Sequence, residues 1–222
     1  MLKKWYWNIH CKKMLKLGIH IYFNQDIKKY NYKHKQNPYI YIIYNNVYII
    51  NIILTTRTLL KACNLVFYAS SLGKEFLILS TEKALEDFIS WISIKSKCHY
   101  ISKKYISGLL TNYSFLQKQK KSKKLQKNFK GIKYMKRVPD VIIMILNKNI
   151  KVNSSILIEC NSLKISTICL IDVKFTNFKN IDNYLYLFDF YIPVNICTRS
   201  SIYYILNKLK FSILEGRLKN KL

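Results

Sequence analysis

The chain has 222 residues, half of them hydrophobic, which is enough for one sizeable core and gives no reason to expect several domains. Its 38 basic and 11 acidic residues leave a formal net charge of +27, which points to a polyanionic partner, either nucleic acid or an anionic membrane. The six cysteines contain no C-x-x-C pair, which excludes a zinc ribbon, and they are too sparse for a secreted disulfide scaffold. We interpret them as small buried hydrophobic residues.

Residue usage is strongly biased. Lys, Ile, Asn and Tyr are abundant, whereas the chain has only 5 Gly and 3 Pro. The abundant residues have A/T-rich codons, so the bias indicates a reduced organellar genome. Because lysine is one of these residues, the number of lysines alone is weak evidence for a function.

The N-terminal part of the chain, residues 1–54, is predicted to form a helix and a β-hairpin that belong to one α/β domain spanning residues 1–222. The first residues, MLKKWYWNIHCKKMLKLG, are charged throughout and lack the apolar segment of a signal peptide. The stretch from Pro38 to Thr56 is about long enough to span a bilayer, but three asparagines interrupt it. Two adjacent asparagines between β-branched and aromatic runs favour a strand, a tight turn and a second strand.

Helices and strands then alternate. A helix is predicted over 55–71, with Thr55 or Thr56 as its cap and Gly73 as its stop. The elements expected after it are a strand at 75–80, a helix at 81–96 with its acids near the start, and a strand at 98–102.

Beyond residue 140 the alternation resumes, with strands at 141–146, 166–172 and 184–195 and helices at 154–163 and 200–215, the last ending just before Gly216. Strands that are apolar on both faces, alternating with amphipathic helices, predict a doubly wound (flavodoxin-like) α/β fold with helices on both faces of a parallel sheet.

A basic segment interrupts this alternation, and we expect residues 112–137 to form a short basic helical hairpin inserted in the domain. No acid occurs between Asp87 and Asp140. A disordered insert, a membrane-surface patch and a surface for a polyanion are the three interpretations. Leu125 and Phe129 lie one helical turn apart, which favours a docked amphipathic helix with outward charges and hence the third interpretation. The candidate nucleic-acid-binding residues are Lys118, Lys120, Lys121, Lys123, Lys124, Lys127, Lys130, Lys133, Lys136 and Arg137.

The sequence shows none of the residue patterns expected of an enzyme active site. A dinucleotide or P-loop site needs clustered glycines at a strand-to-helix turn, but the five glycines never come within twenty residues of each other. Asp172 ends a predicted strand, where a turn or cap role is the simpler interpretation, and Asp140 opens a strand at the opposite edge of the sheet. We expect His20, His34 and His99 to lack a carboxylate or cysteine arrangement that would make a triad, and Cys98 and His99 to be unable to share a metal.

Several phrases, in order, resemble the ribosomal protein S2 family of the bacterial and plastid type. GIHI at residues 18–21 resembles the family's G-V-H-F, and TTRTLLKAC resembles its TAxxLxxA helix. GKEFLILSTEKA is similar to GKxFLIVGTKKQA, ISGLLTNYS to LGGMLTNWxT, LQKNFKGIKYMKRVPDVIIM to LxxxLGGIKxMxxLPDxxxx, KISTICLID to GIPTICLVD, and DFYIPVN to DYxIPGN. The resemblance covers roughly Leu15 to Arg217. The long helical hairpin of bacterial members is reduced here to the residues between Asn112 and Gly131.

The resemblance implies a structural constituent of the small ribosomal subunit that binds rRNA and neighbouring ribosomal proteins. It implies no catalytic role, cofactor, metal, small-molecule substrate or membrane attachment. The phrases KCHYI, GIKYM and TICLID look nearer to plastid than to mitochondrial members, and the composition suggests a reduced plastid such as an apicoplast. A doubly wound nucleotide-binding enzyme and a basic membrane-surface protein are the alternatives.

Overall fold

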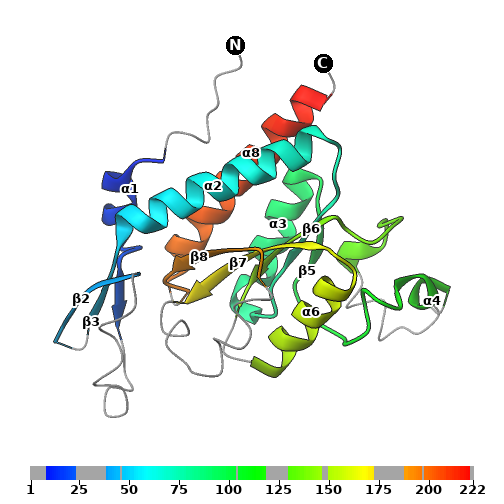
Figure 1. The fold of residues 1–222 in the computed structure, drawn as a ribbon, viewed down its shortest axis with the longest axis horizontal. Coiled ribbons are helices and arrows are strands. Elements are labelled where there is room, and N and C mark those ends of the chain that lie inside the picture. The colour runs from blue at the N-terminus through cyan, green and yellow to red at the C-terminus, as the bar shows by residue number, and fades with distance from the viewer. Residues whose placement is uncertain are drawn as a thin grey trace.

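The fold was analysed in a computed structural model, which describes residues 9–23, 39–45, 47–103, 105–118, 130–146, 150–172, 188–196 and 198–220. Its elements in chain order are α1 (Cys11–Lys16), β1 (Ile21–Phe23), β2 (Ile40–Tyr44), β3 (Val47–Ile50), α2 (Ile52–Ser71), β4 (Phe76–Leu79), η4 (Lys83–Leu85), α3 (Glu86–Ser96), β5 (His99–Ile101), α4 (Tyr113–Lys118), η5 (Lys130–Ile132), β6 (Val141–Ile145), α6 (Ile150–Ser162), β7 (Ser166–Asp172), β8 (Phe190–Val194) and α8 (Arg199–Asn220) (Figure 1).

A parallel five-stranded sheet forms the centre of the molecule, in the order β5-β4-β6-β7-β8. Numbered along the chain, these strands have the order 2-1-3-4-5, which is that of the flavodoxin-like doubly wound sheets. The predicted fold class is therefore confirmed. Every residue of β4 and β6 is buried, as expected for strands covered on both faces.

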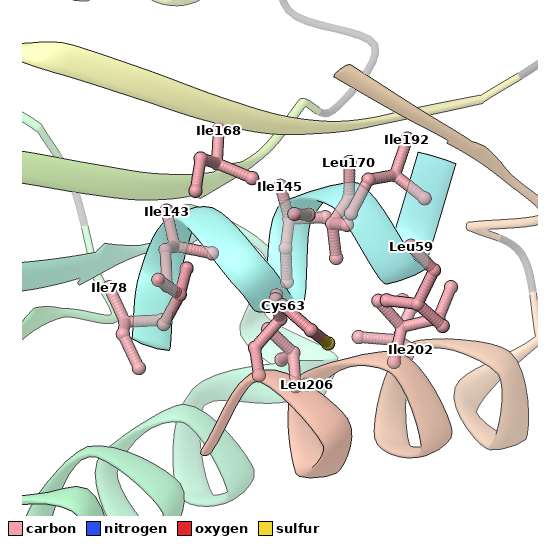
Figure 2. Packing of buried hydrophobic residues seen from close by; sticks show 14 of the residues in the cluster. Leu59, Cys63, Ile78, Ile143, Ile145, Ile168, Leu170, Ile192, Ile202 and Leu206 are labelled. Atoms are coloured by element: carbon pink, nitrogen blue, oxygen red, sulfur yellow. The ribbon is translucent and has the colours of Figure 1, made fainter. Parts of the chain in front are cut away.

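Alternate residues of each strand enter two separate hydrophobic clusters. On one face Ile78, Ile143 and Ile168 pack against α2 and α8, which contribute residues such as Leu59 and Leu206 (Figure 2). On the other face Leu77, Ile142, Met144, Cys169 and Ile171 pack with α6 and with the segments on either side of α4. Successive side chains of a strand point to opposite faces of the sheet, so each apolar strand contributes to both hydrophobic clusters.

The second, smaller sheet is antiparallel, in the order β1-β3-β2. β2 and β3 form a hairpin across Asn45, whose φ of 42° suits a tight turn. The sequence prediction did not include β1 as a third strand. In Figure 1 this sheet and α4 lie at opposite ends of the molecule.

α2 begins earlier than predicted. Asn51, and not Thr55 or Thr56, is the N-cap, and its side-chain oxygen accepts a hydrogen bond from the Leu54 amide at 3.2 Å. The two threonines lie inside the helix and donate to carbonyls four residues back. In the described part of the chain, α2 is the one helix long and apolar enough to cross a membrane, by length and composition. One of its faces is buried in the first cluster, as in a core helix.

α8 continues past Gly216 to Asn220, so the predicted end of this helix was wrong. Gly216 instead marks the place where α8 crosses α2, because a Cβ there would lie 2.5 Å from the Phe67 carbonyl oxygen. The Ser70 hydroxyl donates to the Ile213 carbonyl at 2.6 Å, and the Ser212 hydroxyl donates to the Cys63 carbonyl. Small residues therefore let the two backbones approach closely.

The helix predicted at 81–96 is divided in two, since η4 precedes α3 and α3 starts at Glu86. Glu86 and Asp87 occupy its first turn, as the dipole favours. The cysteines at 63, 98, 160 and 169 are buried as predicted, while Cys11 is partly exposed and Cys197 lies outside the described residues.

Candidate nucleic-acid interface

The loop that leads into the basic segment is attached to α6 through a buried carboxylate. Glu159 of α6 is 8% exposed. It accepts hydrogen bonds from the Tyr105 hydroxyl at 3.0 Å and from the amides of Gly108 at 2.6 Å, Leu110 at 3.0 Å and Thr111 at 3.4 Å. Several amides converging on one carboxylate fix the loop that leads into α4. Burial, followed by the charge of Glu159, raises the pKa of Tyr105, so that its phenol stays protonated as a donor.

Tyr113, the first residue of α4, ties together the two sides of the basic segment. Its hydroxyl lies 3.2 Å from the carbonyl oxygen of Ile132 and 2.7 Å from that of Met135. Gly131 lies directly on β5, because a Cβ there would be 2.1 Å from the Tyr100 carbonyl oxygen. The beginning and the end of the segment are therefore held side by side against the sheet.

The described end of the segment has two distinct faces. Ile132 and Met135 are buried in the second cluster at 3% and 2% exposure. The cations between and beyond them all point outward and are exposed: Lys130, Lys133, Lys136 and Arg137. The spacing of the two buried residues thus orients four of the ten predicted contact residues toward solvent.

The other predicted contact residues are placed less fully. Lys118 is the last residue of α4. Lys120, Lys121, Lys123, Lys124 and Lys127 lie outside the described residues, as do Leu125 and Phe129 of the predicted amphipathic helix. The shortened hairpin and its ten contact residues stay predictions.

Arg137 has a partner that the sequence did not suggest. Its Nη2 lies 3.4 Å from Asp140 Oδ2, while Lys74 Nζ lies 2.9 Å from Asp140 Oδ1 and the Glu75 amide donates to Oδ2 at 2.9 Å. Burial acts to raise the pKa of Asp140, but the amide hydrogen bond and the two cations outweigh it and lower that pKa. Asp140 thus joins the end of the basic segment to the start of β4.

The histidine prediction needs one correction. His99 does have a carboxylate neighbour, since its Nε2 lies 2.9 Å from Glu75 Oε2. The pair arises because β4 and β5 are adjacent parallel strands, which brings together residues 24 positions apart. Cys98 offers no nucleophile beside it, because burial, the largest influence, raises the pKa of its thiol.

The remaining acids and histidines do not assemble a reaction centre. Asp172 is 4% exposed at the end of β7, and Asp140 precedes β6 at the opposite end of the sheet, as predicted. Across the described ranges, no group of three or more His, Cys, Asp and Glu side chains could hold a metal ion. His34 lies outside those ranges.

Two residues that organise the segment were missed by the sequence analysis. Glu159 had no local signal, because its partners lie about 50 residues away in the chain. Tyr113 did have a local signal, since the family phrase LGGMLTNWxT also has an aromatic residue directly after LTN. Its role depends on the fold, which brings Ile132 and Met135 to its hydroxyl.

The comparison with family models agrees with the order of these elements. The model described as ribosomal protein S2 matches residues 14–122 and 114–216. The two matched parts together cover most of the chain, and they overlap at the start of the basic segment. The chain therefore belongs to the ribosomal protein S2 family, a family of structural proteins of the small ribosomal subunit and not of enzymes.

Proposed function

We propose that this protein binds small-subunit rRNA through its basic segment and also contacts neighbouring ribosomal proteins, as a structural constituent of an organellar ribosome. The observation that carries the proposal is the two-sided end of the segment, where Ile132 and Met135 are buried and four cations face outward. A surface with outward lysines and few acids is suited to the phosphate backbone of RNA. Contacts to phosphates supply electrostatic affinity and position the protein without reading the base sequence.

The proposed contact set is the full series of ten cations from Lys118 to Arg137. Most of them lack a nearby acid in the sequence, so an RNA partner would supply the missing negative charge.

We place the ribosome in an organelle, and most specifically in a reduced plastid such as an apicoplast. The support is the bias toward residues with A/T-rich codons and the plastid-like phrases KCHYI, GIKYM and TICLID. Co-localisation of a tagged protein with a plastid marker or with a mitochondrial marker tests this part separately.

The RNA contact is tested by the salt dependence of binding to small-subunit rRNA. Lys130, Lys133 and Lys136 are changed together to Gln, and a second variant changes Lys120, Lys121, Lys123 and Lys124. If the three lysines of the first variant each neutralise one phosphate, the slope of log K against log salt should become shallower by about 2 to 3. The same variants should sediment less with small subunits.

A matched control removes the same charge elsewhere. Lys12, Lys61 and Lys83 are exposed on other elements, and their joint replacement by Gln should leave more of the slope intact. An equal loss of slope in this control and in the Lys130 variant would mean that net charge, and not the basic segment, determines binding.

A further inference from the structure

A second surface of this protein combines exposed aromatic rings with lysines, away from the basic segment. α3 and α8 lie side by side, and their outer faces carry Trp91 and Phe211, which are 46% and 45% exposed. Lys210 of α8 lies over these rings, and Lys95 of α3 is close enough for its charge to act on Lys210. We call Trp91, Lys95, Lys210 and Phe211 the aromatic ridge.

The ring of Trp91 is held in place by a stack of aromatic side chains. Its ring centroid lies 5.9 Å from that of Phe88, with an interplanar angle of 24°. Phe88 in turn stacks on Tyr203 of α8, at 3.7 Å and 22°. The three rings connect α3 to α8, so the half-exposed indole is presented in a fixed orientation.

Lys210 lies over both exposed rings of the ridge. Its Nζ is 4.8 Å from the ring centroid of Trp91 and 4.6 Å from that of Phe211. Burial and then the charge of Lys95 lower the pKa of Lys210. No ion pair of the described residues involves either lysine. An anion bound here would relieve the repulsion between the two ammonium groups.

Acids are distant from this position on both helices. On α3 the nearest is Asp87, which is eight residues before Lys95 and so about 12 Å away along the helix axis. On α8 the one acid is Glu215, five residues after Lys210, where it has an interaction of its own. The cations of the ridge are therefore not neutralised by their own helices.

We propose that the aromatic ridge binds an unpaired nucleotide of rRNA. Its base stacks on Trp91 or Phe211 in the place now taken by the Lys210 ammonium, which moves off the ring to bind the phosphate together with Lys95. Exposed aromatic rings beside lysines are how proteins bind single-stranded nucleic acid. The centre of a protein–protein interface, in contrast, is depleted in lysine. The inference rests on the proposed rRNA-binding function and adds a site that recognises an unstacked base.

The test uses the fluorescence of Trp91. The chain has three tryptophans, so replacing Trp5 and Trp7 by Phe leaves Trp91 as the one indole. This protein is titrated with a single-stranded oligoadenylate and with an RNA duplex of the same length. The single strand should quench Trp91, because a base stacks on the ring, whereas the duplex should bind through its phosphates with little quenching.

Variants then separate stacking from charge. Trp91→Leu should weaken binding of the single strand roughly tenfold, whereas Trp91→Phe should keep most of the affinity because it keeps a ring. Lys210→Gln should weaken binding and make its salt dependence shallower. Tyr68→Leu, on a tyrosine of α2 that is 57% exposed, is the matched control and should have little effect. Circular dichroism checks that each variant is folded.

The outcomes distinguish this inference from the proposed function. Duplex binding with the expected salt slope, but no quenching by the single strand, would overturn the inference alone. Failure of both RNAs to bind would overturn the proposed function as well. Unchanged RNA binding in Trp91→Leu, together with weaker sedimentation with small subunits, would mean that a protein occupies the ridge, which also overturns the inference.

Discussion

At the scale of single residues, the most consequential side chain is the buried carboxylate of Glu159. It receives three amides and one phenol from the loop at residues 105–111. Loops usually satisfy their amides with water, and a buried loop needs a protein acceptor instead. Glu159 thereby converts a connecting segment into a fixed base for α4.

Glu159→Gln should destabilise the protein by about 2 to 3 kcal/mol, because it removes the charge from these hydrogen bonds and turns an amide group toward other donors. The free energy of unfolding in urea measures the loss. Asp87→Asn, an exposed acid in the first turn of α3, serves as the control and should change stability by about 0.5 kcal/mol or less. Similar values for the two variants would mean that Glu159 does not fix the loop.

Residue-level geometry was the part that the sequence could not predict. Glu159 is a lone acid on an amphipathic helix, and nothing near it in the chain indicates that it meets the amides of a distant loop. The pair of His99 and Glu75 likewise depends on which strands become neighbours. In contrast, the alternation of Ile132 and Met135 with lysines is a local pattern, although the sequence analysis used Leu125 and Phe129 to argue which side of the basic segment faces outward.

At the scale of elements, the parallel strands were predictable because each is a continuous apolar run. The start of α2 was not, because Ile52 and Ile53 continue the β-branched character of β3. Only the tertiary hydrogen bonds at the end of β3, including that from the Asn51 amide to the Tyr39 carbonyl, show where the strand gives way to the helix. β1 is three residues long and acquires its partner from a distant segment.

Gly216→Ala tests the crossing of α2 and α8. Alanine favours a helix by about 1 kcal/mol over glycine, so an isolated helix would gain. Here the added Cβ meets the Phe67 carbonyl oxygen at 2.5 Å and Ser70 Cβ at 2.7 Å, and the helices must separate. We expect a net loss of about 1 to 3 kcal/mol in the free energy of unfolding.

Leu218→Ala, at an exposed position of the same helix, is the control for Gly216→Ala and should be close to neutral. A gain in stability on Gly216→Ala would indicate that the crossing adapts without cost and that helix propensity dominates.

At the scale of the whole molecule, basic residues far outnumber acids, and most acids of the described residues already have partners. Glu86 and Asp140 each form an ion pair, Glu75 is hydrogen-bonded to His99, and Glu159 is occupied by amides. The net charge of +27 therefore acts on a surface with few free anions. Such a chain repels itself when it is alone and gains stability from counterions.

We expect the melting temperature of the isolated protein to rise by several degrees between about 20 mM and about 300 mM NaCl, since the Debye length falls to about 6 Å over this range. Differential scanning fluorimetry measures the shift, and sucrose serves as an uncharged control for general solvent effects. A melting temperature that is independent of salt would show that the positive charges are too dispersed to affect stability.

The hydroxyl of Tyr113, held between the carbonyls of Ile132 and Met135, has a consequence for how this molecule can change. The two ends of the basic segment meet at this point. The structure of the sheet therefore does not depend on how many residues lie between them. Closing a longer loop costs only about 0.6 kcal/mol for each doubling of its length. The basic segment can therefore become shorter or longer during evolution, as the rRNA and proteins around it change, without requiring substitutions in the rest of the fold.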